Sequence, residues 1–297
     1  MITLLDYVKE VSNMKKFASK KVTQLFMVII LVIVAVILTS LVKNAIDERK
    51  DLSIDPGNSS VNYQNTVSIT FPEGYTVTQI AKLLEEKNVC SADSFLDAVD
   101  NPSEEILDKF GIKNKDSRIF TLEGYIFPDT YEFYLKEGAD AALKRFIDNF
   151  NAKIDTTVTV KIKNTGYTLD EIITISSIVQ REAGRVNENG KVASVLFNRL
   201  NQKMKLQCDV TIDYIETYVK PYVDNYDKAF TEKYNTYKCE ALPAGPICNP
   251  GLDTILATID HPETKYLFFV TDKDMNYYYA ETFEQHQINY KNAGVTN

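Results

Sequence analysis

Glu182 is the residue whose type and position point most directly to chemistry. It ends a predicted helix over residues 169–182, in which Ile172, Ile175 and Ile178 recur at helical spacing on the face that also carries Glu182. An apolar face disfavours an ionised carboxyl, and the negative end of the helix dipole disfavours it further. A carboxyl with a raised pKa can hold a proton at neutral pH and serve as a general acid.

A carboxylate without a catalytic role is the alternative interpretation. Arg181 and Arg185 flank Glu182 and favour its ionised form. Glutamates at helix ends are mostly solvated, so the side chain could turn outward and pair with one of these arginines. The pattern alone leaves both interpretations open.

The helix that positions Glu182 has clear boundary signals. Thr168 and Glu171 have the spacing of a capping box, and Gly184 is placed to end the helix. Periodicity predicts further helices over residues 142–154, beyond residue 190 and over 282–292, and strands over 67–71, 266–270 and 277–280. This mixture of helices and short strands predicts an α+β fold.

Two folded parts are predicted along this stretch of the chain. Residues 66–118 combine one strand with short amphipathic helices and form a small α+β module. Residues 119–297 form a larger, mixed α+β domain. Within it, residues 206–250 are polar and rich in turn residues, and long loops of this kind are commonly functional.

The N-terminal region is predicted to be a membrane anchor. Every residue from 25 to 38 is apolar, four lysines lie between residues 15 and 21, and the far side has a mixed charge run. The positive-inside rule then predicts a cytoplasmic N-terminus over 1–21, a transmembrane helix over 22–43 and a linker over 44–65, with the rest of this single-pass protein outside the cytoplasm. A cleaved signal peptide is the alternative.

The composition argues against a nucleic-acid partner and favours a polar or carbohydrate-like substrate. The net charge is −8, and no basic cluster occurs in the chain after the anchor. The 18 tyrosines suit stacking on sugars, although core packing explains them equally well. The two histidines, His261 and His286, are isolated in the sequence, so no metal site is predicted.

Short motifs spread over nearly all of the chain after residue 70 carry a family resemblance. They are FPEG (71–74), LEGYIFPDTY (122–131), SIVQREA (177–183), VASVLFNRL (192–200), LQCDVT (206–211), YNTY (234–237), LPAGPI with NPG (242–251) and KYLFFV (265–270). In identity and order, these motifs resemble those of the endolytic murein transglycosylase family, the YceG-like proteins.

The resemblance implies an enzyme of the cell membrane that cuts glycan strands of peptidoglycan without a cofactor. The module over 66–118 is then LysM-like, and 119–297 is the catalytic domain. The second glutamate of the family's Glu-x-Glu motif falls on Glu182, as catalytic acid and base, while Gln180 replaces the first. The expected reaction is lytic, because it leaves 1,6-anhydro-N-acetylmuramyl ends, and it would terminate strand elongation beside peptidoglycan synthases (penicillin-binding proteins) as partners.

The resemblance also predicts substrate-binding residues in a glycan groove around Glu182. They are Glu123, Tyr125, Asp129, Gln207, Asp209, Thr211, Asn235 and Tyr237. Asn198 and Arg199, on a helix, are expected to form scaffolding hydrogen bonds. A disulfide between Cys208 and Cys248 is favoured, with a Cys239–Cys248 bridge or free thiols as alternatives.

Two competing functions stay open from the sequence. One is a membrane-anchored module that binds peptidoglycan without cleaving it. The other is a muramidase that uses water. Replacement of Glu182 distinguishes the first, and the mass of the product distinguishes the second.

Overall fold

The computed structural model describes residues 65–223 and 228–294. The predicted cytoplasmic segment 1–21, the transmembrane helix 22–43 and the linker 44–65, apart from Asn65, lie outside these residues. Within the described part of the chain, no helix has both the length and the apolar character needed to cross a bilayer. The observed mixture of helices and two small sheets is an α+β fold, as predicted.

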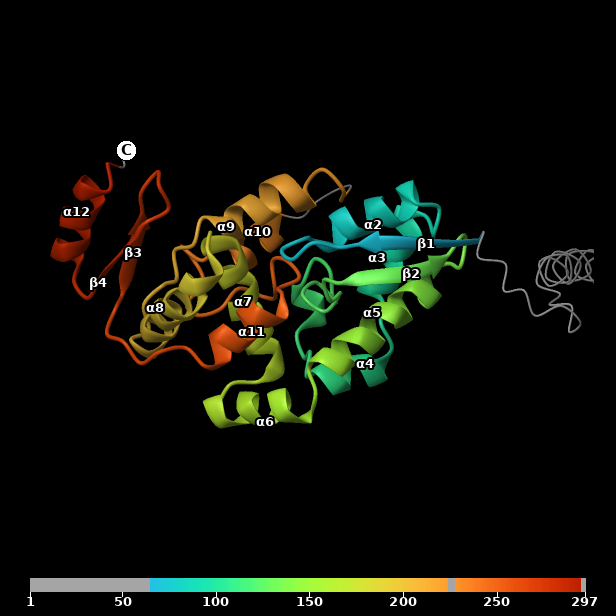
Figure 1. The fold of residues 1–297 in the computed structure, drawn as a ribbon, viewed down its shortest axis with the longest axis horizontal. Coiled ribbons are helices and arrows are strands. Elements are labelled where there is room, and N and C mark those ends of the chain that lie inside the picture. The colour runs from blue at the N-terminus through green and yellow to red at the C-terminus, as the bar shows by residue number, and fades with distance from the viewer. Residues whose placement is uncertain (1–64, 224–227, 295–297) are drawn as a thin grey trace, which may run out of the picture. The chain divides into compact units, whose positions relative to one another are not determined.

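The first sheet joins two segments that are distant in the sequence. Strand β1 (Thr66–Thr70) pairs antiparallel with β2 (Thr130–Tyr134), in a register that places Thr66 opposite Tyr134. Figure 1 shows three helices next to this sheet: α2 (Val77–Glu86), α3 (Ala92–Asp100) and α5 (Ala139–Lys153).

This strand pairing crosses the predicted boundary between the two folded parts, at residues 118 and 119. The sheet needs β2 as its second strand, and α3 packs on α5, so the module around β1 extends well beyond residue 118. Phe71, Phe133 and Phe146 meet edge-on or tilted in its core, with ring centroids 5.1–6.1 Å apart. The small sheet is therefore stabilised by aromatic packing from both sides of the predicted boundary.

The sequence did not predict helices α4 (Glu104–Phe110), α6 (Thr156–Thr165) and α11 (Leu252–Ile259). Of these, α4 and α6 each bury only two side chains. Both begin with a side-chain cap: Ser103 accepts the Ile106 N–H, and Asp155 accepts the Val158 N–H. Their helical state rests on capping and packing more than on an apolar pattern.

Helix α7 (Leu169–Glu182) forms the centre of the larger part of the fold. Every residue from Ile172 to Val179 is buried, so the helix is enclosed on all sides for two turns. It packs against α6, α8 (Asn189–Asn201), α9 (Val210–Asp213) and α11 (Leu252–Ile259). The capping box of Thr168 and Glu171 is present as predicted.

The segment between α8 and α11 is less irregular than predicted. It contains α9, the π-helical turn η4 (Tyr214–Val219) and α10 (Lys228–Tyr234). Two 3₁₀ turns lie earlier in the chain. The turn η2 (Lys115–Ser117) comes just before the buried residues 118–128, and η3 (Val186–Glu188) comes just before α8. Residues 235–251 remain loop, and their last part is buried.

The C-terminal elements form a hairpin covered by a helix. The two predicted strands and the predicted terminal helix are present. Strand β3 (Phe268–Thr271) pairs antiparallel with β4 (Tyr277–Ala280), and α12 (Phe283–Asn292) packs on both strands, as Figure 1 shows. The tip of this hairpin contacts the end of α7. A Cβ atom on Gly184 would lie 1.8 Å from Cε of Met275, so Gly184 leaves room for the hairpin, whereas Ala183 caps the helix.

Candidate active site

Glu182 lies at an open cavity of about 430 Å³. The walls come from the end of α7, from α8, from the 206–210 loop with Tyr237, and from the C-terminal hairpin and α12. The lining residues are Glu182, Val195, Leu196, Arg199, Leu206, Gln207, Cys208, Asp209, Val210, Tyr237, Phe268, Phe269, Val270, Phe283, His286 and Tyr290. A titratable side chain thus faces a space with polar groups on one side and aromatic rings on the other.

The environment of Glu182 favours its protonated form. Burial raises the pKa of this carboxyl, the nearby Asp209 carboxylate raises it further, and the Cys208 thiol and the Arg199 guanidinium lower it, with a result of about 7. The ordinary value is 4.5. A carboxyl with this pKa is shared between its acid and base forms near neutral pH, which suits a group that must both give and take a proton.

Neither flanking arginine pairs with Glu182, so the ion pair that the alternative interpretation invoked is not formed. Arg181 forms an ion pair with Asp213 at 2.7 Å. Arg185 donates to the backbone carbonyl of Asp274, also at 2.7 Å. Both guanidinium groups therefore have other partners.

Two loops with predicted site residues meet beside Glu182. The Cys208 N–H donates to Oγ1 of Thr236 at 2.9 Å, and the Gln207 N–H donates to the Thr236 carbonyl. Through this junction Gln207, Asp209 and Tyr237 reach the cavity, and the Tyr237 hydroxyl donates to Asp209 at 2.7 Å.

Thr211 and Asn235 support these loops from behind. Thr211 is buried and donates to the Cys208 carbonyl at 2.8 Å. Asn235 accepts the Tyr237 N–H through Oδ1 at 2.9 Å, an Asx turn that orients the tyrosine. Neither residue lines the cavity, so the structure does not place them with Glu182 in the predicted groove.

Glu123 does not lie in the groove that was predicted for it. Its side chain is fully buried, and it accepts hydrogen bonds from the Val77 N–H, the Tyr214 hydroxyl and the Asn249 amide at 3.0–3.2 Å. Burial raises the pKa of this carboxyl to about 8, although the hydrogen bonds from Val77 and Tyr214 lower it. The role of Glu123 is structural, because it joins three segments inside the core.

Tyr125 and Asp129 also have structural partners instead of a place at the cavity. The buried Tyr125 hydroxyl donates to Asp170 at 2.6 Å, at the start of α7. Asp129 pairs with Lys153 at 2.9 Å, and that bond lowers its pKa. The motif 122–131 is therefore a buried connection between the sheet and α7, since residues 121–128 are all buried.

The favoured disulfide is absent, because all four cysteines are free thiols. Cys208 lies at the cavity beside Glu182, whereas the Cys248 thiol donates to the Ser177 carbonyl in the core at 3.3 Å. Cys239 donates to the Lys233 carbonyl at 3.3 Å, so the alternative bridge to Cys248 is not formed either.

Several cavity residues could not be identified from the sequence. Arg199 donates to the carbonyls of Leu206 and Leu267 at 2.6 Å and so connects the loop wall to the hairpin wall. This bonding fits the scaffolding role predicted for it, as do the bonds from Asn198 to the 264 and 266 carbonyls. The aromatic residues that α12 adds to the lining, Phe283, His286 and Tyr290, carried no local signal, because they lie 101 or more positions after Glu182.

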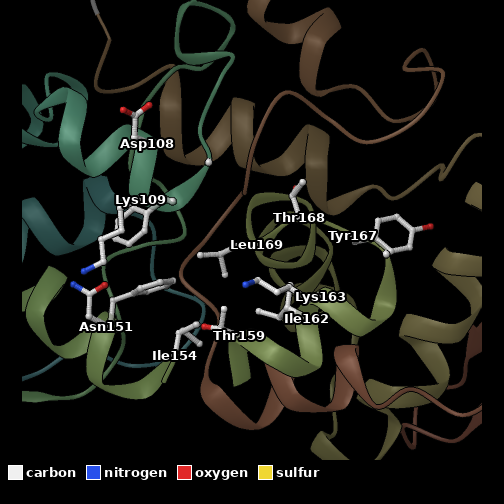
Figure 2. A pocket seen from close by; sticks show the side chains of 14 residues that line it. Asp108, Lys109, Asn151, Ile154, Thr159, Ile162, Lys163, Tyr167, Thr168 and Leu169 are labelled. Carbon is white, nitrogen blue, oxygen red and sulfur yellow. The ribbon is translucent and has the colours of Figure 1, made fainter. Parts of the chain in front are cut away.

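A second cavity, of about 500 Å³, lies near the other end of α7 (Figure 2). Its lining is mostly apolar and includes Ile154, Ile162 and Leu169. Its one carboxylate, Asp108, points away from the other labelled side chains in Figure 2. This cavity lacks the acid and base groups that gather at Glu182. Within residues 65–223 and 228–294, no group of three His, Cys, Asp or Glu side chains is placed to hold a metal ion.

Comparisons with known proteins identify the family. The model of the YceG-like family matches residues 49–292. An endolytic murein transglycosylase from Streptococcus pneumoniae (strain ATCC BAA-255 / R6) is 30% identical over 245 residues, which are 75% of this chain and 44% of that protein. One from Bacillus subtilis (strain 168) is 29% identical over 227 residues, or 73% and 62%.

A solved structure shares the fold. The crystal structure of a yceG-like protein from Listeria monocytogenes superposes with a TM-score of 0.63 at 26% identity, over 74% of this chain and 75% of that one. The curated relatives are longer than the matched region, and the chain spans about half of their length.

Proposed function

Since the chain belongs to the YceG-like family, we propose that it is an endolytic murein transglycosylase with Glu182 as its single acid and base. The observation that carries the proposal is the partly buried carboxyl at the open cavity, with a pKa near 7 and no arginine partner. The names of the curated relatives support the same reaction class.

The reaction uses one carboxyl twice. Protonated Glu182 donates its proton to the glycosidic oxygen between N-acetylmuramic acid and N-acetylglucosamine, and the bond from C1 to that oxygen breaks. The resulting carboxylate accepts the proton of the muramyl C6 hydroxyl while O6 closes on C1. The product is a 1,6-anhydro end, and no water is consumed, unlike in hydrolysis by paired carboxylates.

The proposal extends to the cellular setting. Residues 22–43 form a single transmembrane helix with the N-terminus in the cytoplasm, and the module around β1 is LysM-like. The apolar run over 25–38 and the preceding lysines support the anchor. An enzyme held at the membrane acts on nascent strands beside the peptidoglycan synthases and so limits strand length.

The test is product analysis of purified peptidoglycan digested by the full chain and by its Glu182→Gln variant. The variant keeps the size of the side chain but cannot donate or accept the proton, so cleavage should fall by about 10²–10⁴-fold. The wild type should release products that end in 1,6-anhydro-N-acetylmuramic acid. Glu86→Gln, an exposed glutamate at the end of α2, is the matched control and should cleave normally.

The competing functions predict different results. Unchanged cleavage by Glu182→Gln would remove Glu182 from the mechanism, and no cleavage by any form would favour the binding module. Products heavier by one water, with reducing ends, would identify a muramidase.

A further inference from the structure

Part of the cavity lining is built from aromatic rings of the C-terminal elements. Phe268 begins β3, and Phe283, His286 and Tyr290 follow on α12. The last three recur at spacings of three and four residues, so they share one face of the helix. This face belongs to the same cavity as Glu182.

The rings form a continuous surface. The ring of His286 stacks on Phe268 with centroids 5.1 Å apart and planes 21° apart. Phe283 adjoins both, at centroid distances of 5.9 Å from Phe268 and 6.3 Å from His286. Arg199 lies over the Phe268 ring at 5.1 Å and adds a cation–π contact on the side of α8.

Within this surface Phe283 is exposed, whereas Phe268 and His286 are partly buried. Phe283 is 55% exposed, although it lines a cavity that also holds a titratable carboxyl. The Nδ1 atom of His286 is buried and has no hydrogen-bond partner within the described residues. Burial and the nearby Arg199 lower the pKa of His286, so its ring is neutral at physiological pH.

We propose that Phe268, Phe283 and His286 form a sugar-stacking subsite, which holds a pyranose ring of the glycan strand next to the bond that Glu182 cleaves. Pyranose rings present apolar C–H faces that pack on aromatic planes, and ordered apolar surfaces with few polar atoms are typical of ligand sites. The ring of Phe283, which is 55% exposed, is open to such a face. This inference rests on the proposed function, because it names a subsite of the same cavity.

Binding in the Glu182→Gln background tests the subsite without turnover. The probe is a soluble oligosaccharide of alternating N-acetylglucosamine and N-acetylmuramic acid, titrated calorimetrically into the full chain. Phe283→Ala and Phe283→Leu should each weaken binding by about three- to twelvefold, because leucine keeps apolar area but lacks an aromatic plane. Phe283→Trp should retain the affinity.

Ile288→Ala is the matched control. Ile288 is 52% exposed on the same helix but does not line the cavity, so its loss should leave binding unchanged. Equal affinities for Phe283→Ala and Ile288→Ala would overturn the subsite. If the chain with Glu182 intact cleaves glycan and this equality holds, only the subsite fails. If it does not cleave but Phe283→Ala still weakens binding, the transglycosylase proposal fails and the subsite stands.

Discussion

The proton on Glu182 depends on a neighbouring carboxylate. Asp209 lies in the same cavity, and its negative charge is the second largest cause, after burial, of the raised pKa of Glu182. Tyr237 donates to Asp209 and holds it in place. Asp209 is therefore an electrostatic neighbour that favours the protonated form of Glu182.

Asp209→Asn should shift the pH profile of cleavage. The acid step needs protonated Glu182, so activity falls as the pH rises through about 7. Removal of the Asp209 charge lowers the pKa of Glu182, so this decline should begin at a lower pH. The measurement is kcat/KM for glycan cleavage between pH 5 and 9.

Asp213→Asn is the control for this shift. Asp213 has the same charge four residues later but pairs with Arg181 instead of facing the cavity. Identical profiles for the Asp209 and Asp213 variants would show that Asp209 does not set the protonation of Glu182.

At the residue scale, sequence reasoning identified the centre of the site better than its edges. Helical spacing alone marked Glu182, because an acid on an apolar face is unusual. Glu123 and Tyr125 were misplaced, since a motif shared with a family does not distinguish buried structural residues from residues that touch substrate. Both residues are buried by segments that are distant in the sequence, so the residues next to them in the chain do not reveal their burial.

At the scale of elements, the C-terminal hairpin controls the end of the helix that carries Glu182. The Gly184 N–H donates to the Tyr277 hydroxyl at 2.7 Å, and this hydroxyl lies 3.4 Å from the Glu182 carbonyl, to which it donates. One phenol thus satisfies two backbone groups where α7 ends.

Tyr277→Phe should loosen the end of α7 while the fold persists. Loss of the hydroxyl should lower the free energy of unfolding by about 0.5–1.5 kcal/mol. It should also lower kcat several-fold with little change in KM, since the carboxyl of Glu182 loses its fixed position. Chemical denaturation and steady-state kinetics measure the two effects.

Tyr278→Phe provides the comparison from the adjacent position. The Tyr278 hydroxyl donates to Asp272 within the hairpin turn at 3.1 Å and has no bond to α7. If both variants change kcat equally, the contact between the hairpin and α7 has no special role in catalysis.

Elements with a clear apolar pattern were predictable, and those with a weak pattern were not. Helices α5, α7 and α8 and the pairing of β3 with β4 follow from apolar periodicity. Helices α4 and α6 escaped because each buries only two residues, so their pattern is weak. The pairing of β1 with β2 joins segments 60 residues apart, and no local signal specifies such a partner.

At the scale of the whole molecule, Glu123 connects parts of the chain that are far apart in sequence. Its carboxyl binds Val77 at the start of α2, Tyr214 in η4 and Asn249 in the loop before α11. Because burial raises its pKa from 4.5 to about 8, the folded protein holds a proton there that the unfolded chain loses at a much lower pH.

The stability of the protein should therefore decline with pH because of Glu123. Between about pH 4.5 and 8 the folded state binds more protons at this site, so its contribution to the free energy of unfolding falls by up to about 1.4 kcal/mol per pH unit. Glu123→Gln cannot titrate and should give a shallower decline. Denaturant titrations from pH 5 to 8.5 measure the slope, and Glu86→Gln serves as the exposed control.

Parallel slopes for wild type and Glu123→Gln would contradict this account. The absolute stability of the variant is a separate quantity, because glutamine presents an N–H₂ group to donors that now face a carboxyl. Only the difference in slope reports the buried proton.

Arg199 determines how wide the cavity is before any ligand arrives. Its guanidinium bonds the Leu206 carbonyl on one wall and the Leu267 carbonyl on the other, both at 2.6 Å. Arg199 thus links the two walls directly. A glycan strand would enter a preorganised cleft, so little of its binding free energy would be lost to ordering the protein.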